Sequence, residues 1–414
     1  MKNNPFTSKT FVDSWFEASE RGFEKINISC IKTLLFYKPY SLIPIYINAG
    51  KNLTKGIYYH FLNKDCPEFN GKTCLIYDVP EYFKINHLSQ SVGVKKIKQY
   101  PGFLAYLEEY NNFDDYMLAT FKRKSRSKLR KYKNRLEKSF DITYKVFHGH
   151  IEQEEYKYIF DCFKKLLEKR FDEKNQANNN LNPKEWNFYY DVAYPLILEK
   201  KAGLFVVYEN KTPIAITLKY FSDKIIFGAI TVFDIDFTKF HLGSISIMKN
   251  IEWSIKEGYD VLDYSKGDYF YKQRWFKTKY DFYYHIVYDK KSLKARLLAN
   301  LVSYFFKFKQ KMREKNLNET LSKIKYSLIK QKDKKVIDKS IDYKMEDVLE
   351  KHTIDNLISV NYFDNRHHKL KMLVFEFLYL NEENIKDTNL YRIKDSSNHY
   401  IIEGKNIKKK LVLV

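Results

Sequence analysis

Apolar and polar positions alternate along the chain with two periods, which predict a mixture of short strands and amphipathic helices. In the first hundred residues, apolar runs of strand length occur at 32–37, 42–47 and 73–78, with turn residues between them. The apolar spacing over 11–24 and over 103–110 instead favours two short helices. We therefore expect a small α+β unit at the start of the chain, and it contains no motif that indicates catalysis.

The middle of the chain begins with long amphipathic helices and continues with strands. Apolar residues recur at three- and four-residue steps over 118–140 and over 154–171, and a third helix is expected over 186–200. Three strand-like runs follow with tight turns between them, at 203–208, 213–221 and 224–232. This order is typical of an antiparallel meander.

The pattern of apolar and polar residues changes again after these strands. Its pattern predicts a helix over 244–256 that ends at Gly258, and then a short strand over 261–264. A loop is expected over 265–269, followed by aromatic-rich strands that continue to Tyr288. We therefore expect a helix, a strand and a glycine turn in close succession.

The last part of the chain is predicted to be helical and basic at first and then to form a separate tail. The helical part starts at Leu293, a break is expected near 316–318, and a charged linker is expected over 331–339. The tail at 342–414 has helix-like and then strand-like pieces. A chain of 414 residues exceeds one ordinary core. We therefore expect four segments: an N-terminal lobe at 1–115, a C-terminal catalytic lobe at 116–290, a basic helical segment and linker at 291–340, and a small extension of unknown role at 341–414.

Charge changes this picture by favouring polyanionic neighbours. Lys and Arg number 73 against 51 Asp and Glu, which gives a formal net charge of +22. A balance of this kind suits nucleic acid, an anionic membrane or phosphorylated small molecules. Ten of the basic residues lie between 122 and 138, against Glu137 alone. That face of the expected helix is either a solvated surface or an electrostatic guide for an anionic ligand.

Cysteine usage and hydropathy indicate an intracellular protein without a metal centre. The four cysteines, Cys30, Cys66, Cys74 and Cys162, form no CxxC pair, so we expect no zinc site and free thiols in a reducing compartment. The N-terminus lacks the apolar core of a secretory signal. The strongest apolar run, 297–306, is too short to cross a bilayer, which takes about 20 residues. We therefore expect a cytoplasmic protein, with contact at the inner face of the membrane left open.

Glycine is scarce, with 13 in the chain, yet four of them fall between 228 and 267. Gly243 lies where a strand has ended and a helix is about to begin, so free N–H groups are expected around 240–246. Helix N-termini of this kind bind phosphate through those donors and the helix dipole. Ser244 could instead serve as an ordinary N-cap. The segment contains neither a Walker loop nor a GxGxxG fingerprint, so a phosphate site and a simple helix cap both stay open.

Asp263 is the first candidate for chemistry, because it lies near the end of a short buried strand. A carboxylate there costs free energy unless it is paired or functional. Lys272 and Arg274 follow the turn at Gly267 and could neutralise Asp263 or a phosphate. A structural Asp263–Lys272 pair explains the same residues, so both interpretations stay open.

Several residues and short motifs in this region have the order and spacing that are found in a known family. They are Phe233–Asp234, Leu242–Gly243–Ser244, Asp263, Gly267, Tyr271–Lys272 and Trp275. Together they resemble the signature of the CelD-type branch of the GNAT acyltransferases, which occurs near polysaccharide and cell-envelope biosynthesis. The basic run 124–130 and the segment 166–170 are similar to two helices of that family. The resemblance covers roughly residues 10–290 and fades in the tail.

The resemblance implies an α+β fold of two GNAT-like lobes, each a mostly antiparallel twisted sheet flanked by helices, with a C-terminal extension. It also relates the chain to the Fem-type peptidyltransferases. In GNAT proteins the strand before the phosphate loop splays from its neighbour and pairs with the pantetheine arm of acyl-CoA. Carried over, that strand is 225–232, with Ile230, Thr231 and Val232 at its end. The pyrophosphate would bind at the next turn, which is formed by His241, Leu242, Gly243, Ser244 and Ile245.

The expected reaction is direct acyl transfer to an amine or hydroxyl, with no metal. Asp263 is the first choice of general base and Asp234 the second. Lys272 would stabilise negative charge or anchor an anionic acceptor, and Tyr271 would protonate the leaving thiolate. The phosphate loop of the family is matched only at Gly243. The expected donor is acyl-CoA, with acetyl-CoA first, or else an acyl carrier protein or an aminoacyl-tRNA.

Three functions follow from these patterns. The first is an N- or O-acyltransferase that acts on a sugar, an amino sugar or a lipid-linked envelope precursor. The second is a tRNA- or nucleic-acid-binding protein, or a Fem-like aminoacyl-tRNA-dependent transferase, which the charge favours. The third is a peripheral membrane role for the helix at 293–311. The alternative for this helix is that it packs on the catalytic lobe. The acceptor, the acyl chain and the oligomeric state stay open.

Overall fold

In the computed structural model, one mixed sheet runs through most of the protein. The structure describes residues 3–19, 22–40, 42–62, 66–86, 91–314, 342–348, 356–394 and 396–413. Within these residues eleven strands form the sheet, and neighbours pair antiparallel except β4 with β6 and β11 with β12. In order across the sheet the strands are β1 Ile26–Asn27, β3 Leu35–Tyr37, β4 Ile45–Asn48, β6 Thr73–Pro80, β13 Thr278–Asp289, β7 Val92–Tyr106, β12 Val261–Lys266, β11 Ile225–Phe233, β10 Thr212–Ser222, β9 Ala202–Glu209 and β8 Ile142–Phe147. The expected mixed α+β fold with a mostly antiparallel sheet is confirmed.

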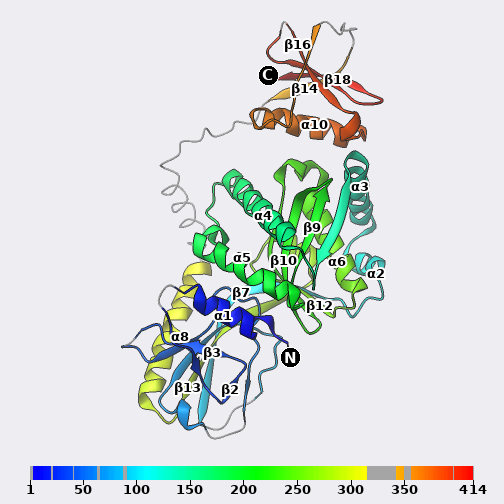
Figure 1. Cartoon of the computed structure of the whole chain (residues 1–414). Helices are drawn as coiled ribbons and strands as arrows, with labels where there is room; N and C mark the ends of the chain where they lie inside the picture. The colour runs from blue at the N-terminus through cyan, green and yellow to red at the C-terminus, as the bar shows by residue number, and fades with distance from the viewer. Residues whose placement is uncertain are drawn as a thin grey trace.

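β7 joins the two halves of this sheet (Figure 1). One edge of β7 pairs with β13, and the other edge pairs with β12. β13 follows β12 in the sequence, yet it lies between β6 and β7 in the N-terminal half. The helix expected over 103–110 is wrong, because Phe103, Leu104 and Ala105 are buried residues of β7. An apolar run that is buried on both faces has no period that separates a strand from a helix.

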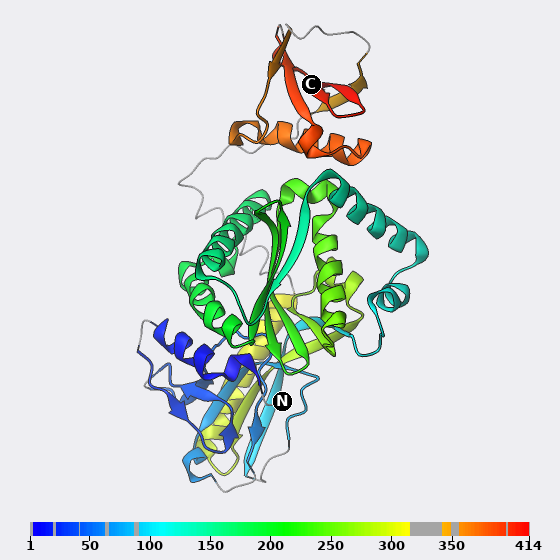
Figure 2. The ribbon, with the colours of Figure 1, turned by 45° about the vertical axis from the view of Figure 1, so that its right-hand side comes forward.

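Helices cover both faces of the C-terminal half of the sheet (Figure 2). On one face lie α4 (Gln153–Glu173) and α5 (Pro183–Leu198), which share a core with β9 and β11. On the other face lie α3 (Arg123–Ser139) and α6 (Leu242–Lys256), which form a second core with the opposite side of the same strands. The apolar period of the sequence predicted the positions of α4, α5 and α6 closely, because each helix buries an apolar face and exposes a polar one.

The helix expected over 118–140 is two helices, α2 (Phe113–Thr120) and α3. The chain breaks at Phe121, where the backbone is extended and the ring is buried against Trp275. Burial of this ring therefore overrides the helical period of the residues around it. A second difference follows β12. Strands were expected directly after the loop at 265–269, but a short helix, α7 (Phe270–Trp275), forms before the next strand.

Two further helices belong to the N-terminal half of the molecule. α1 (Lys9–Glu17) packs against α5, and α8 (Leu293–Glu314) packs along β6, β7 and β13. The helix expected from Leu293 onward is therefore confirmed as α8. The break expected near 316–318 and the linker expected over 331–339 lie outside the described residues.

Cys30 and Cys66 form a disulfide in the N-terminal half, so the expectation of free thiols is wrong for this pair. Their Cα atoms lie 5.8 Å apart although 36 residues separate them in the sequence. Cys74 is free and buried, and Cys162 is free and half-buried. Only the fold brings Cys30 to Cys66, and spacing along a sequence does not show such an approach.

A small C-terminal unit packs against α3 (Figure 1). It consists of α10 (His368–Asn381) and five strands, which in order across their sheet are β14 Tyr343–Asp347, β18 Lys408–Leu413, β17 His399–Glu403, β16 Asn389–Ile393 and β15 Leu357–Ser359. The ring of Phe375 on α10 contacts the rings of Phe140 and Phe237 of the main unit. The segment expected as a separate tail therefore shares a core with α3 and α6.

The described residues also bear on membrane and metal binding. None of their helices has the length and apolar content that are needed to span a bilayer. They include no group of three or more His, Cys, Asp or Glu residues placed to hold a metal ion.

Candidate functional site

β11 and β12 run side by side at one end and then part, which opens a fork in the sheet. They pair only over Ile225–Phe227, and Phe227 lies opposite Asp263. β11 stays paired with β10 as far as Phe233. Residues 228–233 therefore have a strand edge that β12 does not cover, and the N–H and C=O groups of that edge can pair with an extended ligand.

Three of the residues that are predicted to contact the donor, Ile230, Thr231 and Val232, lie on this open stretch of β11. Ile230 and Val232 are buried in the core shared with α4, and Thr231 is half-buried. Contacts between this stretch and a ligand would therefore come mainly from its backbone.

The far end of β11 leads into the first turn of α6. η4 (Ile235–Phe240) intervenes, and His241 then serves as N-cap in the left-handed region, with a φ of 56°. The N–H groups of Ser244 and Ile245 donate to the carbonyl of His241, and the N–H groups before them precede the helical hydrogen bonds. The predicted pyrophosphate residues, His241 to Ile245, thus form a helix N-terminus at the end of the fork, where the helix dipole favours an anion.

Close packing requires a glycine at position 243. A Cβ atom at this position would lie 2.7 Å from Cε1 of Phe233, at the end of β11. The guanidinium of Arg170 on α4 lies 4.7 Å from the centroid of the same ring. Ser244 is not the helix cap, because His241 holds that position, so the interpretation of Ser244 as an ordinary N-cap is wrong.

His241 stacks on Tyr132 of α3, with ring centroids 3.7 Å apart. Partial burial lowers the pKa of His241, and the positive charges of Arg274 and Lys239 lower it further. The imidazole is therefore mostly neutral at pH 7. Positive potential at this end of α6 comes instead from Arg274, Lys239 and the helix dipole.

Asp263 on β12 is fully buried, and three donors hold its carboxylate. The hydroxyl of Tyr82 donates to Oδ2 at 2.7 Å, the hydroxyl of Tyr280 donates to the same oxygen, and the N–H of Ser265 donates to Oδ1 at 2.6 Å. Burial raises the pKa of Asp263 to about 6, although these hydrogen bonds and the charge of Lys272 act in the opposite direction. The carboxyl group therefore exchanges its proton close to neutral pH, as a general base must.

Lys272 on α7 is buried, and backbone carbonyls hold its ammonium group. Its Nζ donates to the carbonyl of Lys266 at 2.6 Å and to that of Ser265 at 3.1 Å. Burial lowers the pKa of Lys272 to about 7, while the charge of Asp263 acts in the opposite direction. Lys272 and Asp263, both of which the structure describes, share no hydrogen bond or ion pair. Each therefore influences the charge of the other without forming the direct pair that the sequence left open.

Tyr271 lies beside Lys272 on α7, with its side chain 37% exposed. Its ring stacks near that of Tyr269, with centroids 6.0 Å apart. Partial burial raises the pKa of Tyr271, and the charge of Arg170 opposes that shift. The phenol therefore keeps its proton at neutral pH and has a proton to donate.

Asp234 lies at the other end of the fork. Its carboxylate caps η4 by accepting from the N–H of Asp236 at 3.1 Å, and it pairs with Lys169 at 2.6 Å. Asp234 follows Phe227 by seven residues, about 23 Å along an extended strand, whereas Asp263 lies opposite Phe227. Of the four predicted catalytic residues, Asp263 on β12 and Lys272 on α7 therefore lie at the same end of the fork. Tyr271 is the neighbour of Lys272 on α7, and Asp234 lies apart from all three.

One comparison concerns the middle of the chain, which contains the fork. A family model described as an acetyltransferase (GNAT) domain matches residues 123–273, from the start of α3 to α7. Residues 123–273 are therefore similar to a GNAT acetyltransferase domain. The match contains the fork, the first turn of α6 and Asp263, and it does not distinguish the CelD-type branch from others.

Several solved structures resemble the fold at low sequence identity. FemX has 12% identity, a TM-score of 0.46 and coverage of 72% of this chain and 94% of its own. A conserved protein of unknown function from Bacteroides thetaiotaomicron has 14% identity, a TM-score of 0.44 and coverage of 70% and 94%. The L-PGS structure from Bacillus licheniformis has 12% identity, a TM-score of 0.40 and coverage of 74% and 98%. No curated protein matches the sequence.

The sequence did not reveal the partners of Asp263. Tyr280 comes from β13, beyond the matched GNAT domain, and Tyr82 follows β6 at a sequence separation of 181 residues. An ion pair joins Lys266 of β12 to the buried Asp78 of β6. The signal that singled out Asp263, a carboxylate at the end of an apolar run, also describes Asp78 and could have found it.

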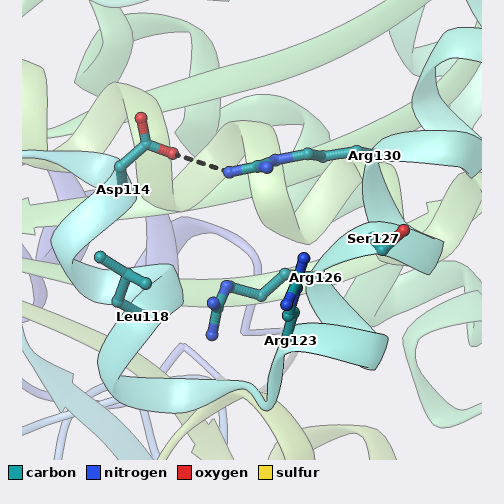
Figure 3. A pocket seen from close by; sticks show the side chains of 6 residues that line it. All are labelled: Asp114, Leu118, Arg123, Arg126, Ser127 and Arg130. Carbon is teal, nitrogen blue, oxygen red and sulfur yellow. Dashed lines mark ion pairs between the residues drawn. The ribbon is translucent and has the colours of Figure 1, made fainter.

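A cavity that is lined by arginines lies where the segment that matches the GNAT model begins (Figure 3). Its volume is about 570 Å³, and Arg123, Arg126 and Arg130 of α3 line it together with Asp114 and Leu118 of α2. Arg130 pairs with Asp114 at 3.7 Å. The first turn of α3 contains no acidic residue, and Arg123 and Arg126 lie at that end of the helix, where the dipole is positive. The cavity therefore favours an anionic ligand.

Proposed function

We propose that the protein is an acyltransferase that moves an acyl group from acyl-CoA to an amine or hydroxyl of a sugar or another cell-envelope precursor. The fork between β11 and β12 carries this proposal. Its open edge at 228–233 suits an extended arm that contains amides, and the first turn of α6 suits the phosphates at the far end of that arm. The GNAT match over 123–273 supports the same class of reaction.

In this proposal, Asp263 accepts the proton of the acceptor through a tyrosine hydroxyl. The acceptor nitrogen or oxygen attacks the thioester carbonyl carbon, the C–S bond breaks, and the thiolate takes a proton from Tyr271. Asp263 then gives a proton to solvent and the Tyr271 phenolate takes one from solvent, which restores both groups. Asp263 is fully buried, whereas Tyr82 is half-buried and donates to its carboxylate. The proton of the acceptor therefore reaches Asp263 by way of Tyr82. The positive charge of Lys272 stabilises the carboxylate form of Asp263 before each turnover.

Release of the CoA thiol tests the reaction directly. The full chain is incubated with acetyl-CoA and a panel of amino sugars and envelope-type precursors, and free thiol is followed over time. We expect thiol release that depends on at least one acceptor and yields an acylated product by mass spectrometry. Absence of acceptor-dependent release with acetyl-CoA and with longer acyl-CoA esters would count against the proposal.

The arginine cavity favours a second candidate, a transferase that takes its group from aminoacyl-tRNA, or a tRNA-binding protein. A polyanion satisfies several arginines at once, and the net charge of +22 suits such a ligand. CoA carries fewer phosphates, so it depends less on a distributed basic surface. The two candidates therefore differ in how strongly binding of the donor should depend on the arginines of the cavity.

Paired charge variants of α3 separate the two candidates. Arg123→Ala/Arg130→Ala removes two charges from the cavity, and Lys128→Ala/Lys131→Ala removes two exposed charges elsewhere on the same helix. In the tRNA candidate, the arginine variant weakens tRNA binding by at least about tenfold more than the lysine variant, as measured by fluorescence titration at two salt concentrations. Equal weakening by both variants would indicate general charge attraction and would contradict a tRNA site in the cavity.

A further inference from the structure

Seven large apolar side chains of α8 are exposed in the described part of the chain. Their exposed fractions run from 37% at Met312 to 70% at Tyr304. The set consists of Leu293, Leu297, Leu301, Tyr304, Phe305, Phe308 and Met312. Single exposed apolar residues are ordinary, but a contiguous set of this size marks a surface that binds something.

These side chains form one stripe along the helix. With 3.6 residues per turn, they fall within about 120° of the circumference. Ala295, Ala299, Ser303 and Phe306 lie on the opposite side and are buried. Phe306, for example, packs on Tyr284 of β13, with ring centroids 4.1 Å apart. α8 therefore already has its contact with the core, and the stripe is not needed to hold the helix in place.

Exposed cations border this stripe. α8 contains six Lys and Arg residues against one Glu. Lys294, Arg296, Lys307 and Lys311 are exposed, and none of them pairs with a carboxylate of the described residues. The surface around the stripe is therefore both apolar and positive.

We propose that α8 lies in the plane of an anionic membrane surface, with its stripe at the boundary of the acyl chains and its cations against the headgroups. A lipid surface satisfies an apolar stripe and a border of cations at the same time. A second copy of the chain fits less well, because two such helices would bring like charges together. The helix is about 33 Å long and does not have the composition of a spanning segment, so it lies on the membrane and does not cross it.

The expected packing of 293–311 on the catalytic lobe is met only by β13, because the buried face of α8 also lies on β6 and β7 of the N-terminal half. One face packs on the sheet, and the other faces outward along the N-terminal half of the molecule (Figure 1). The inference does not depend on acyl transfer. If the proposed function holds, membrane binding also favours a lipid-linked acceptor, because α8 packs along β7, and β7 pairs with β12, the strand that carries Asp263.

Vesicle flotation of the full chain tests this inference. The vesicles contain equimolar phosphatidylglycerol and phosphatidylcholine, or phosphatidylcholine alone. Leu297→Gln/Leu301→Gln changes the stripe, and the control Leu198→Gln/Leu380→Gln changes two exposed leucines on α5 and α10. We expect the natural chain and the control to float with anionic vesicles, and we expect the stripe variant to lose at least about tenfold in partitioning. Binding should be weaker to neutral vesicles and at high salt.

A charge variant gives an independent readout. Lys307→Glu/Lys311→Glu leaves the stripe intact and should also abolish binding to anionic vesicles. Failure of the natural chain to float with anionic vesicles, or equal flotation of the natural chain and both α8 variants, would overturn the inference. Light scattering without vesicles addresses self-association. A dimer that the stripe variant converts to a monomer would overturn the inference in favour of an interface between copies, whereas equal masses support it.

Discussion

Asp263 and Lys272 titrate close to neutral pH because both are buried. Burial raises the pKa of Asp263 to about 6 and lowers the pKa of Lys272 to about 7. The charge of each group partly opposes the shift of the other. Because the two titrations interact, the steps seen in an experiment belong to the pair as a whole.

We expect the rate of acyl transfer to follow a bell-shaped pH profile. The rate rises as Asp263 loses its proton near pH 6, and it falls as Lys272 loses its proton near pH 7 and above. Asp263→Asn should remove the acid limb and lower kcat/KM by about a hundredfold to ten-thousandfold. Lys272→Arg should move the alkaline limb upward, because a guanidinium keeps its charge. Initial rates of thiol release across the pH range measure both effects, and an acid limb that survives in Asp263→Asn would contradict the assignment of the base.

Lys219 on β10 is a buried cation that the proposed chemistry does not use. Its Nζ has no hydrogen-bond partner in the described structure, and it lies 4.7 Å from a ring centroid of Trp253. Burial lowers the pKa of Lys219 to about 7. An unfolded chain gives lysine its ordinary pKa of about 10.4, so the unfolded state binds this proton more tightly. Stability is therefore lost as the pH falls from about 10 to about 7.

Lys219→Met should raise the free energy of unfolding near pH 7 by about 2 kcal/mol or more, because it removes a buried amine that lacks a partner. The gain should shrink as the pH rises to about 11, above the ordinary lysine pKa of about 10.4, where the natural lysine is mostly neutral in both states. Urea denaturation at the two pH values measures it, with the exposed Lys211→Met as a control that changes little. An equal gain at both pH values would show that packing, and not charge, is responsible.

At the scale of elements, the start of α6 is packed closely against the end of β11. Gly243 leaves room for the ring of Phe233, which also lies against the guanidinium of Arg170. Gly243→Ala places a methyl group 2.7 Å from that ring and should destabilise the protein by about 1–3 kcal/mol. Thermal or urea unfolding measures the loss, and the neighbouring Ser244→Ala serves as the control.

A double variant checks the cause. Phe233→Leu removes the ring that the new methyl group meets, so its combination with Gly243→Ala should cost less than the sum of the two single changes. Strict additivity would mean that the ring is not what the alanine meets.

Periodicity predicted those elements that bury one face and expose the other. α4 and α6 follow that pattern. It failed for residues 103–110, where β7 is buried on both faces, and at Phe121, where one buried ring divides a basic amphipathic run into two helices. Both failures have the same cause, which is that tertiary packing outweighs local preference.

At the scale of the whole molecule, the site draws on segments that lie far apart in the sequence. Asp263 could be singled out because a buried carboxylate at the end of a strand is costly, but Tyr82 and Tyr280 reach it only through the pairing of β6, β13 and β7. No pattern along the chain shows such contacts. The glycine at the start of α6 could be predicted, and its close packing against Phe233 could not.

The C-terminal unit is held against η4, the segment that leads into the first turn of α6. The carboxylate of Asp236 on η4 accepts from His368 at 2.9 Å and from Lys371 at 2.8 Å, both on α10, and it also pairs with Lys169 at 2.5 Å. These partners lower the pKa of Asp236 although burial acts in the opposite direction. The extension therefore supports the segment that positions the proposed phosphate site.

Calorimetric titration of the full chain with acetyl-CoA tests the central claim, that the fork between β11 and β12 receives an acyl-CoA donor. We expect saturable binding at one site, with a dissociation constant on the order of 1 μM to 1 mM. Pantetheine without phosphates should bind more weakly, because the first turn of α6 then has no anion to hold. Absence of binding heat with acetyl-CoA and with longer acyl-CoA esters, from protein shown by circular dichroism to be folded, would contradict the account.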